Sequence, residues 1–178
     1  MPRFSDPERL DAEHGLSGFD CGIGSLDIWL ERHARTASAA GSAQTFVVTD
    51  SDQGARVVGY YALAVASVSH LEATHRAAAG MPRHDIPAVL LARLAVDKSA
   101  QWKGIGALLL RDAMMRAVTV SEEAGVRLLL VHALNDGART FYANFGFEPS
   151  PTDAMNVQMI IKDIRASLDA AAAQPEAN

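Results

Sequence analysis

The stretch QWKGIGALLLRDAMMRA, residues 101–117, places two glycines directly before an apolar pattern with the spacing of a helix. The N-terminus of a helix presents N–H groups without intrahelical partners and a partial positive charge, so it binds anions. Gly104 and Gly106 lack a Cβ atom, so an oxyanion can approach their main chain closely, and Lys103 adds a charge beside them. The stretch therefore predicts a site for a phosphate or pyrophosphate, the alternative being a glycine-rich turn without a ligand.

Length and charge set the outer limits of the interpretation. The chain of 178 residues suits one domain with a sizeable core, and its formal net charge is −5. A protein coated with basic charge is thereby excluded, whereas a local basic patch is not. The first residues contain no apolar segment of the kind that a secretory signal needs. The single cysteine, Cys21, cannot form an internal disulfide, which favours a reducing cytoplasm.

Apolar runs and turn residues predict an alternation of strands and helices. We expect a single domain, residues 1–178, in which residues 1–18 and 166–178 are peripheral. A helix over residues 25–40 is expected to be capped by Ser25. Strands are predicted at residues 45–50, 56–70, 88–97, 127–134 and 155–164, further helices at 104–124 and 135–146, and irregular chain at 74–87. This order indicates an α/β fold with a mixed central sheet covered by helices.

The glycine spacing excludes two common nucleotide-binding motifs. It lacks the G-x-x-x-x-G-K-[ST] of a phosphate loop, and Leu109 stands where a G-x-G-x-x-G fingerprint has its third glycine. The remaining pattern is Q-x-x-G-x-G after a buried strand, and it resembles the acetyl-CoA loop of the GNAT superfamily of N-acetyltransferases. The resemblance implies a GNAT fold, with a splayed parallel strand pair in the mixed sheet. It also implies acetyl-CoA as co-substrate, without a metal.

The resemblance assigns roles around the loop. In the family, the main chain at the end of the preceding strand pairs with the pantetheine amides. The positions that correspond here are Leu94, Ala95 and Val96. The diphosphate is expected at Gln101, Trp102, Lys103, Gly104, Ile105 and Gly106. Trp102 departs from the small residue or arginine that these loops more often carry, and its indole can stack on CoA or crowd it.

A second block, HALNDGARTFYANFGFEPS at residues 132–150, looks like the final conserved block of the family. By that resemblance Tyr142 lies near the CoA sulfur and protonates the leaving thiolate as a general acid. Ala138, Phe141 and Phe145 have core spacing, so Tyr142 is expected one position off this stripe, leaning toward the cleft. The alternative for Tyr142 is a packing role. Asn135 is expected to bond the pantetheine, to cap the helix, or both.

Four segments together resemble one subfamily more closely. They are residues 19–37, 57–64, 86–117 and 138–164. The subfamily comprises the GNAT-fold toxins of bacterial type II toxin–antitoxin modules. This resemblance implies transfer of an acetyl group to the α-amine of an aminoacyl-tRNA, which blocks translation. It further implies a cytoplasmic homodimer that is restrained by a ribbon-helix-helix antitoxin.

The chemistry of the acceptor agrees with that implication. A lysine amine is almost wholly protonated at neutral pH, whereas an α-amine has a pKa of about 7.7–8.0 and needs less help from a base. The strand before the loop offers Arg93 and no acid until Asp97, which favours a low-pKa amine, although an acid elsewhere could act through water. The alternatives are a GNAT enzyme for a small amine, a peptide N-terminus or a protein lysine, and a non-enzymatic CoA-sensing or DNA-binding module.

Binding of tRNA requires contacts with its phosphates. The helix at residues 25–40 is expected to present two arginines three positions apart on one side. The candidates for tRNA contact are Arg32, Arg35, Arg76, Arg83 and Arg93, and any one of them can instead be a solvated surface charge. His70, His75 and His84 lack the spacing of metal ligands, so no metal site is expected.

Overall fold

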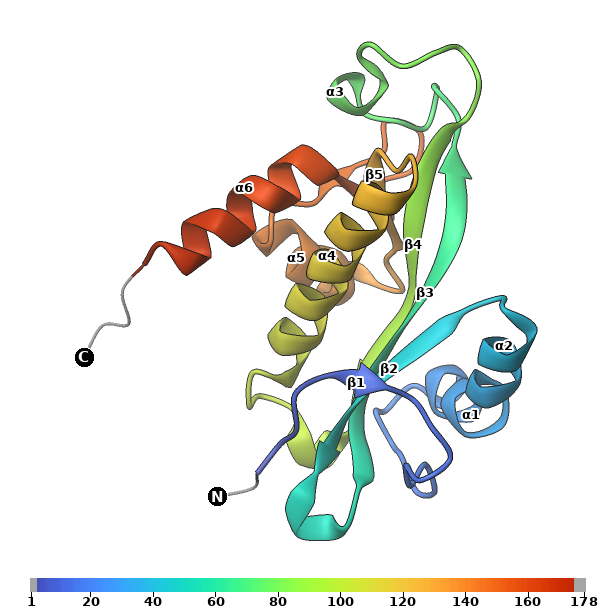
Figure 1. The fold of residues 1–178 in the computed structure, drawn as a ribbon, viewed down its shortest axis with the longest axis vertical. Coiled ribbons are helices and arrows are strands. Elements are labelled where there is room, and N and C mark those ends of the chain that lie inside the picture. The colour runs from blue at the N-terminus through green and yellow to red at the C-terminus, as the bar shows by residue number, and fades with distance from the viewer. Residues whose placement is uncertain (1–2, 175–178) are drawn as a thin grey trace. The chain divides into compact units, whose positions relative to one another are not determined.

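Hydrogen bonding arranges seven strands in the order β1-β2-β3-β4-β5-β7-β6 in a computed structural model that describes residues 3–174. The strands are β1 Glu8–Arg9, β2 Gln44–Asp50, β3 Arg56–Val68, β4 Ile86–Val96, β5 Leu128–His132, β6 Glu148–Pro149 and β7 Asn156–Ile160. The helices are α1 Gly24–Arg32, α2 Ala34–Ala40, α3 His75–Ala78, α4 Ile105–Glu123, α5 Asp136–Asn144 and α6 Ile161–Ala172 (Figure 1). β4 and β5 run parallel, and β1–β2, β2–β3, β5–β7 and β6–β7 are antiparallel, which confirms the predicted mixed sheet.

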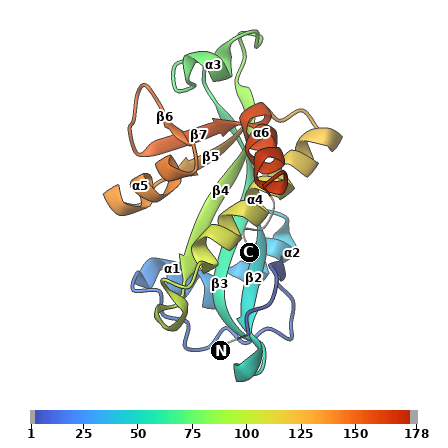
Figure 2. The same cartoon turned by 90° about the vertical axis from the view of Figure 1, so that its left-hand side faces the viewer.

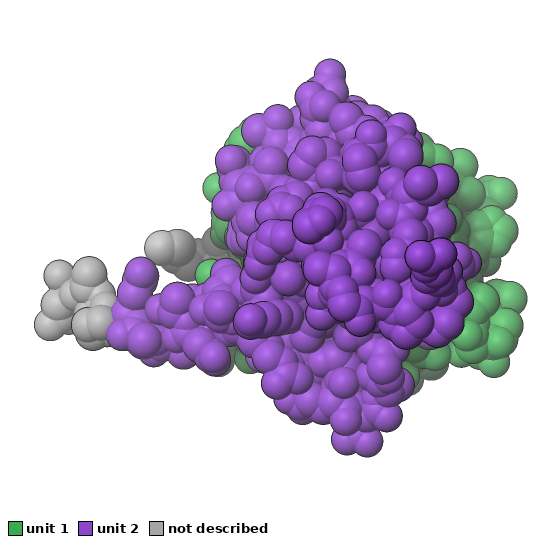
Figure 3. All heavy atoms as spheres, turned by 90° about the horizontal axis from the view of Figure 1, so that it is seen from above, with its two compact units in different colours: residues 1–64, 91–113 green, residues 65–90, 114–178 purple. Residues whose placement is uncertain are grey.

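The chain divides into two compact units, coloured separately in Figure 3. Unit 1 comprises residues 1–64 and 91–113, and unit 2 comprises residues 65–90 and 114–178. β3, β4 and α4 each contribute residues to both units. None of the helices within residues 3–174 combines the length and the hydropathy that crossing a membrane requires.

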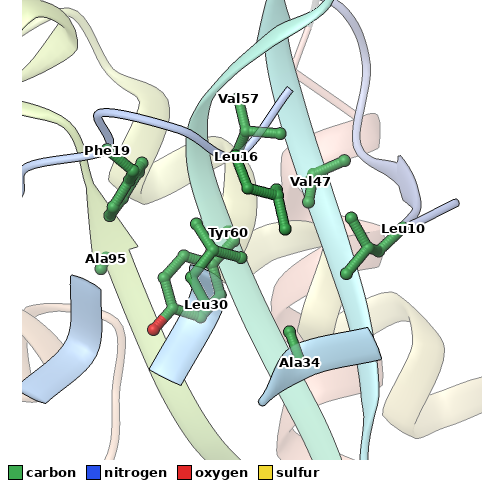
Figure 4. Close-up of a cluster of buried hydrophobic side chains, with 9 residues drawn as sticks. All are labelled: Leu10, Leu16, Phe19, Leu30, Ala34, Val47, Val57, Tyr60 and Ala95. Atoms are coloured by element: carbon green, nitrogen blue, oxygen red, sulfur yellow. The ribbon is translucent and has the colours of Figure 1, made fainter. Parts of the chain in front are cut away.

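The core of unit 1 draws on the N-terminal segment, which we predicted to be peripheral. β1 pairs with β2, and Leu10 and Leu16 are buried beside Val47 in the cluster shown in Figure 4. Leu10 and Leu16 are therefore part of the core, although most of residues 3–18 are exposed or partly buried. The cause is long-range, because a polar, turn-rich segment carries no local signal that its few apolar side chains are needed by a distant sheet.

A second difference in unit 1 concerns the helix predicted over residues 25–40. It is interrupted at His33, where α1 ends and α2 begins. Ser25 does not cap it, because the N-cap position is Ile23, which makes no side-chain capping hydrogen bond. Leu30 and Ala34 are both fully buried, one on each side of the interruption. The change of direction thus lets both helices contribute to the same core.

Unit 2 is built around β5 and β7, which are joined in full register from Leu128↔Ile160 to His132↔Asn156 (Figure 2). Val68, Ile86 and Leu128 belong to its buried cluster. The strand predicted over residues 155–164 is shorter than expected, because α6 starts at Ile161. The segment predicted to be irregular contains the short helix α3.

Candidate active site

The loop in unit 1 has the geometry of an anion-binding helix start. β4 ends at Val96, and α4 begins at Ile105 after a turn in which Trp102 and Gly104 adopt φ values of 63° and 83°. The first helical bond runs from the Leu108 amide to the Gly104 carbonyl at 3.0 Å. The amides of residues 104–107 precede that bond and so have no acceptor within the helix. Three of these residues, Gly104, Ile105 and Gly106, belong to the segment 101–106 at which the sequence predicted a diphosphate.

Gly59 in β3 sets how closely the start of α4 approaches the strand. A Cβ atom there would lie 2.8 Å from Ile105 Cγ2 and 3.1 Å from Leu109 Cδ1. Distances this short leave no room for a side chain. Our sequence analysis did not identify this residue, although a glycine inside a strand pattern signals a close approach of backbone or helix.

A buried carboxylate holds the segment between β4 and the loop. Asp97 Oδ2 accepts hydrogen bonds from the Asp20 amide and from Arg56 Nη2, each at 3.0 Å. Asp97 Oδ1 accepts from the Ser99 amide at 2.9 Å and its hydroxyl at 2.6 Å. Burial alone would raise the pKa of the Asp97 carboxyl, but the hydrogen bonds with Ser99 and Asp20 outweigh burial and lower it. Arg56 acts in the same direction.

Gln101 has a bracing role that sequence reasoning missed. Its side-chain amide donates to the Cys21 carbonyl at 3.1 Å and to the Val96 carbonyl at 3.0 Å. The side chain therefore joins the loop to the segment before α1. Lys103 Nζ donates to the Ser99 carbonyl at 2.8 Å. The Trp102 side chain is fully exposed.

The second predicted element of the site lies in unit 2. Asn135 caps α5, because its Oδ1 accepts from the Ala138 amide at 2.8 Å. This confirms one of the two roles expected for Asn135. Tyr142 is only 6% exposed, and its ring packs edge-on against Phe141 and Phe147 with centroids at 5.2 and 5.6 Å. Burial raises the pKa of Tyr142, so its phenol is protonated throughout the neutral range.

The predicted core stripe of α5 was wrong in one respect. Tyr142 is the buried residue of this helix, whereas Ala138, Phe141 and Phe145 are only partly buried. The reason is a residue outside the helix. The chain reverses at Gly146, whose φ is 97°, and this brings the Phe147 ring against Tyr142. A helical repeat counts only residues on the helix and does not register this partner.

Three of the five candidate arginines for tRNA binding have partners within the protein. The Arg93 guanidinium lies over the Trp29 ring, 4.2 Å from its centroid. Arg35 donates to the carbonyls of Asp11 and His14, at 3.2 and 2.7 Å from Nη2. Both arginines therefore stabilise unit 1.

Arg76 is the third arginine with a partner, and the other two candidates are exposed. Arg76 forms a bidentate pair with Asp163 at 2.8 and 3.0 Å within unit 2. Arg32 and Arg83 are exposed. The prediction that Arg32 and Arg35 share one side of a continuous helix was wrong, because α1 ends at Arg32 and Arg35 belongs to α2.

In the part of the chain that the structure describes, no group of three or more His, Cys, Asp or Glu side chains could hold a metal ion. A family model described as an acetyltransferase (GNAT) domain matches residues 41–149, which contain the loop, Asn135 and Tyr142. The chain belongs to the GNAT acetyltransferases. Within them it groups with the tRNA-acetylating toxins. It is 42% identical to the tRNA-acetylating toxin of Mycobacterium tuberculosis over 166 residues, which cover 93% of this chain and 98% of that toxin.

Solved structures agree with this grouping. The toxin AtaT complexed with acetyl-methionyl-tRNAfMet matches with a TM-score of 0.85 and 29% identity, covering 93% of this chain and 99% of that one. A tyrosine-to-phenylalanine mutant of AtaT bound to the C-terminus of the antitoxin AtaR and to acetyl-CoA matches with a TM-score of 0.79 and 28% identity. That match covers 93% of this chain and 98% of the mutant. The predicted GNAT fold is thereby confirmed.

Proposed function

We propose that this chain is a toxin that transfers the acetyl group of acetyl-CoA to the α-amine of an aminoacyl-tRNA and so blocks translation. The observation that carries the proposal is the 42% identity with a tRNA-acetylating toxin over almost the full length of both chains. The alternative acceptors, a small amine, a peptide N-terminus or a protein lysine, are not favoured by this relative. The solved KacTA–DNA complex and the DNA-bound AtaT–AtaR complex favour DNA binding together with an antitoxin as an additional role, beside the acetyl transfer and not in place of it.

The start of α4 is proposed to hold the diphosphate of acetyl-CoA. The amides of Gly104, Ile105 and Gly106 lie at the N-terminus of α4, which is the positive end of the helix dipole. Gly104 has a left-handed φ of 83° at this turn. The Lys103 ammonium supplies a further charge, and the exposed Trp102 indole is available to stack on the nucleotide. Gln101 supports the loop from within rather than through a direct contact.

The end of β4 is proposed to position the rest of the donor. The main-chain groups of Leu94, Ala95 and Val96 are expected to pair with the pantetheine amides, as the family resemblance implies. Val96 already accepts one hydrogen bond from Gln101 Nε2, at 3.0 Å, and a carbonyl oxygen has a second lone pair for another. Asn135, beyond its role as helix cap, is proposed to hydrogen-bond the pantetheine, as the family resemblance implies.

Tyr142 is proposed as the general acid. The amine nitrogen forms a bond to the thioester carbonyl carbon and loses one proton to solvent, and the carbon–sulfur bond breaks. The Tyr142 phenol gives its proton to the departing thiolate and regains one from water, so atoms and charges balance. The raised pKa of Tyr142 suits this role, because the phenol retains its proton until the sulfur needs it.

The acceptor and partners complete the proposal. Arg32 and Arg83, both exposed, are the arginines best placed to contact phosphates of the tRNA. Arg35, Arg76 and Arg93 are proposed to contribute by shaping the surface around them. We further propose one cytoplasmic acetyltransferase domain per chain, a homodimeric assembly, and neutralisation by a ribbon-helix-helix antitoxin. A relative bound to the C-terminus of its antitoxin supports an antitoxin as partner.

A labelling experiment tests the acceptor. The purified protein is incubated with radiolabelled acetyl-CoA in three separate reactions, which contain aminoacylated tRNA, spermidine or total protein as the acceptor. We expect label on the charged tRNA, with none on the same tRNA after deacylation. Label that appears on spermidine or protein alone would overturn the toxin assignment and leave a different acetyltransferase.

A further inference from the structure

Unit 2 contains a cavity of about 260 Å³ that none of the predicted site residues lines. Ala66, Val68 and Leu130 give it an apolar wall, and Glu72, His132 and Asn156 give it a polar one. Val68 and Leu130 are buried, as are the polar lining residues Ser150 and Gln158, whereas Glu72 and His132 are exposed and lie nearer the solvent. We call this the His132 cavity. A cavity of about 150 Å³ already admits a molecule of benzene, so this one can hold a group the size of a small amino acid.

The polar wall has a defined hydrogen-bonding pattern. His132 Nδ1 contacts Asn156 Oδ1, and since an amide oxygen only accepts, Nδ1 carries the proton of this hydrogen bond. In the neutral ring the lone pair is then on Nε2. His132 can therefore accept a hydrogen bond from a ligand N–H at Nε2.

Glu72 is held in place from two sides. Its Oε2 accepts from the Ser69 amide at 3.1 Å and from the Ser69 hydroxyl at 2.7 Å. Its carbonyl accepts from Ser150 Oγ at 2.7 Å and from Gln158 Nε2 at 3.0 Å, and both of these side chains are buried. The hydrogen bonds from the Ser69 hydroxyl and amide lower the pKa of Glu72. Glu72 is thus a pre-positioned carboxylate, and it is the only lining residue with a full charge at neutral pH.

A carboxylate, an imidazole acceptor and an apolar wall together fit a primary amine on a small organic body. We propose that the His132 cavity receives the amine-bearing end of the acetyl acceptor, with Glu72 attracting the amine and His132 Nε2 orienting its N–H. This assignment rests on the proposed function, whose acceptor is the α-amine of an aminoacyl ester.

The chain itself keeps the cavity within reach of the predicted chemistry. His132 ends β5, and Asn135 caps the helix that carries Tyr142. The three residues from His132 to Asn135 span at most about 11 Å. His132 at the cavity and Asn135, which is proposed to meet the pantetheine, therefore lie on one short segment of unit 2.

Filling the cavity gives the first test. Ala66→Phe would place a ring in the space that the acceptor needs. The matched control is Val65→Phe, because Val65 is 92% exposed and does not line the cavity. We expect Ala66→Phe to raise the KM for total aminoacylated tRNA at least tenfold, with the calorimetric Kd for acetyl-CoA within twofold of wild type. Val65→Phe should leave both values unchanged.

Removing the polar contacts gives the second test. It also tests the cavity proposal if Ala66→Phe does not fold and therefore no longer binds acetyl-CoA. Glu72→Gln and His132→Gln should each raise the KM for charged tRNA about five- to tenfold. The controls are Glu123→Gln and His75→Gln, exposed residues of unit 2 outside the cavity. A KM and kcat within twofold of wild type in both cavity variants would overturn the proposal.

The two proposals fail in distinguishable ways. If the wild type labels spermidine instead of charged tRNA, the toxin assignment fails, and the same variants then test the cavity with spermidine as acceptor. Unchanged KM values in an enzyme that does acetylate charged tRNA would refute the cavity alone. A wild type that acetylates no amine overturns both.

Discussion

Tyr142 is a packed side chain for which we also propose a chemical role. Its ring is enclosed by Phe141 and Phe147, and burial raises the pKa of its phenol. The surrounding rings fix the direction of the side chain, and they provide no charge that would take its proton. A packing role and a catalytic role are therefore compatible at this residue.

Replacement of Tyr142 by phenylalanine should leave the packing and remove the acid. We expect kcat to fall by about 10²- to 10⁴-fold, the usual contribution of a general acid, with the Kd for acetyl-CoA little changed. Tyr60→Phe is a suitable control, because Tyr60 is also buried but its hydroxyl bonds the Leu26 carbonyl at 2.8 Å. That control should lose about 1 kcal/mol of stability and keep its kcat. Equal kcat values in the two variants would contradict the assignment.

Asp97 is the residue on which the position of the loop depends. Asp97→Asn removes the negative charge that pairs with Arg56 and accepts the hydrogen bonds from Ser99 and Asp20. We expect it to destabilise the protein by about 2 kcal/mol and to weaken acetyl-CoA binding. The pKa of Asp97 is lowered on folding, so its contribution to stability is present above pH ~4, the unfolded value, and is lost as the pH falls further.

Denaturant unfolding between pH 3 and pH 7 measures this effect. The difference in free energy of unfolding between wild type and Asp97→Asn should shrink toward the acid end. Asp6→Asn, at an exposed site, serves as the control. A difference that is constant with pH would show that the carboxylate charge is not what stabilises the loop.

At the scale of elements, the strand–loop–helix unit could be predicted because its signals are local. The apolar strand, the two glycines and the helical spacing that follows are consecutive in the sequence. The supports of that unit could not be predicted in the same way. Asp97 bonds residues 77 and 41 positions away, and Gln101 bonds Cys21, 80 positions away. Only the folded chain brings these partners together.

The end of β7 illustrates a different limit. MIIKDI is an apolar run that fits a strand as well as the first turn of a helix. Ile161 and Ile164 are three residues apart and both buried, which is the spacing of one face of a helix. Ile160, at the N-cap position, makes no capping hydrogen bond, so the usual N-cap residue is missing and Asp163 in the first turn is a weaker signal of a helix start.

The contact between β3 and α4 gives a test at this scale. Gly59→Ala would place a Cβ against the side chains of Ile105 and Leu109, so these side chains or the first turn of α4 have to shift. We expect a loss of about 1–3 kcal/mol in stability and weaker acetyl-CoA binding by calorimetry. Gly125→Ala, where an added Cβ meets nothing within 4 Å, should change neither. Full acetyl-CoA affinity in Gly59→Ala would show that the loop does not depend on this packing.

At the scale of the whole molecule, the charge balance limits how the tRNA is bound. The net charge is −5, and Arg35, Arg76 and Arg93 have partners within the protein. Arg32 and Arg83 remain as exposed candidates for phosphate contact. We therefore expect the acceptor to be recognised through few phosphates and mainly through its aminoacyl end.

The salt dependence of the KM for charged tRNA measures the number of phosphate contacts. We expect a shallow slope, on the order of two, in a plot of the logarithm of KM against the logarithm of the salt concentration. Arg32→Ala and Arg83→Ala should each lower this slope by about one. Lys162→Ala, an exposed site on α6, is the control. A steep slope that neither arginine variant changes would place the tRNA contacts elsewhere.

The most direct measurement is mass spectrometry of aminoacyl-tRNA from bacteria in which this chain is induced briefly without an antitoxin. The account predicts N-acetylated aminoacyl-adenosine on at least one tRNA after nuclease digestion, together with growth arrest. Both should be absent when Tyr142→Phe is expressed at the same soluble level. Unmodified aminoacyl-tRNA in cells that contain abundant folded wild-type protein would contradict the assignment.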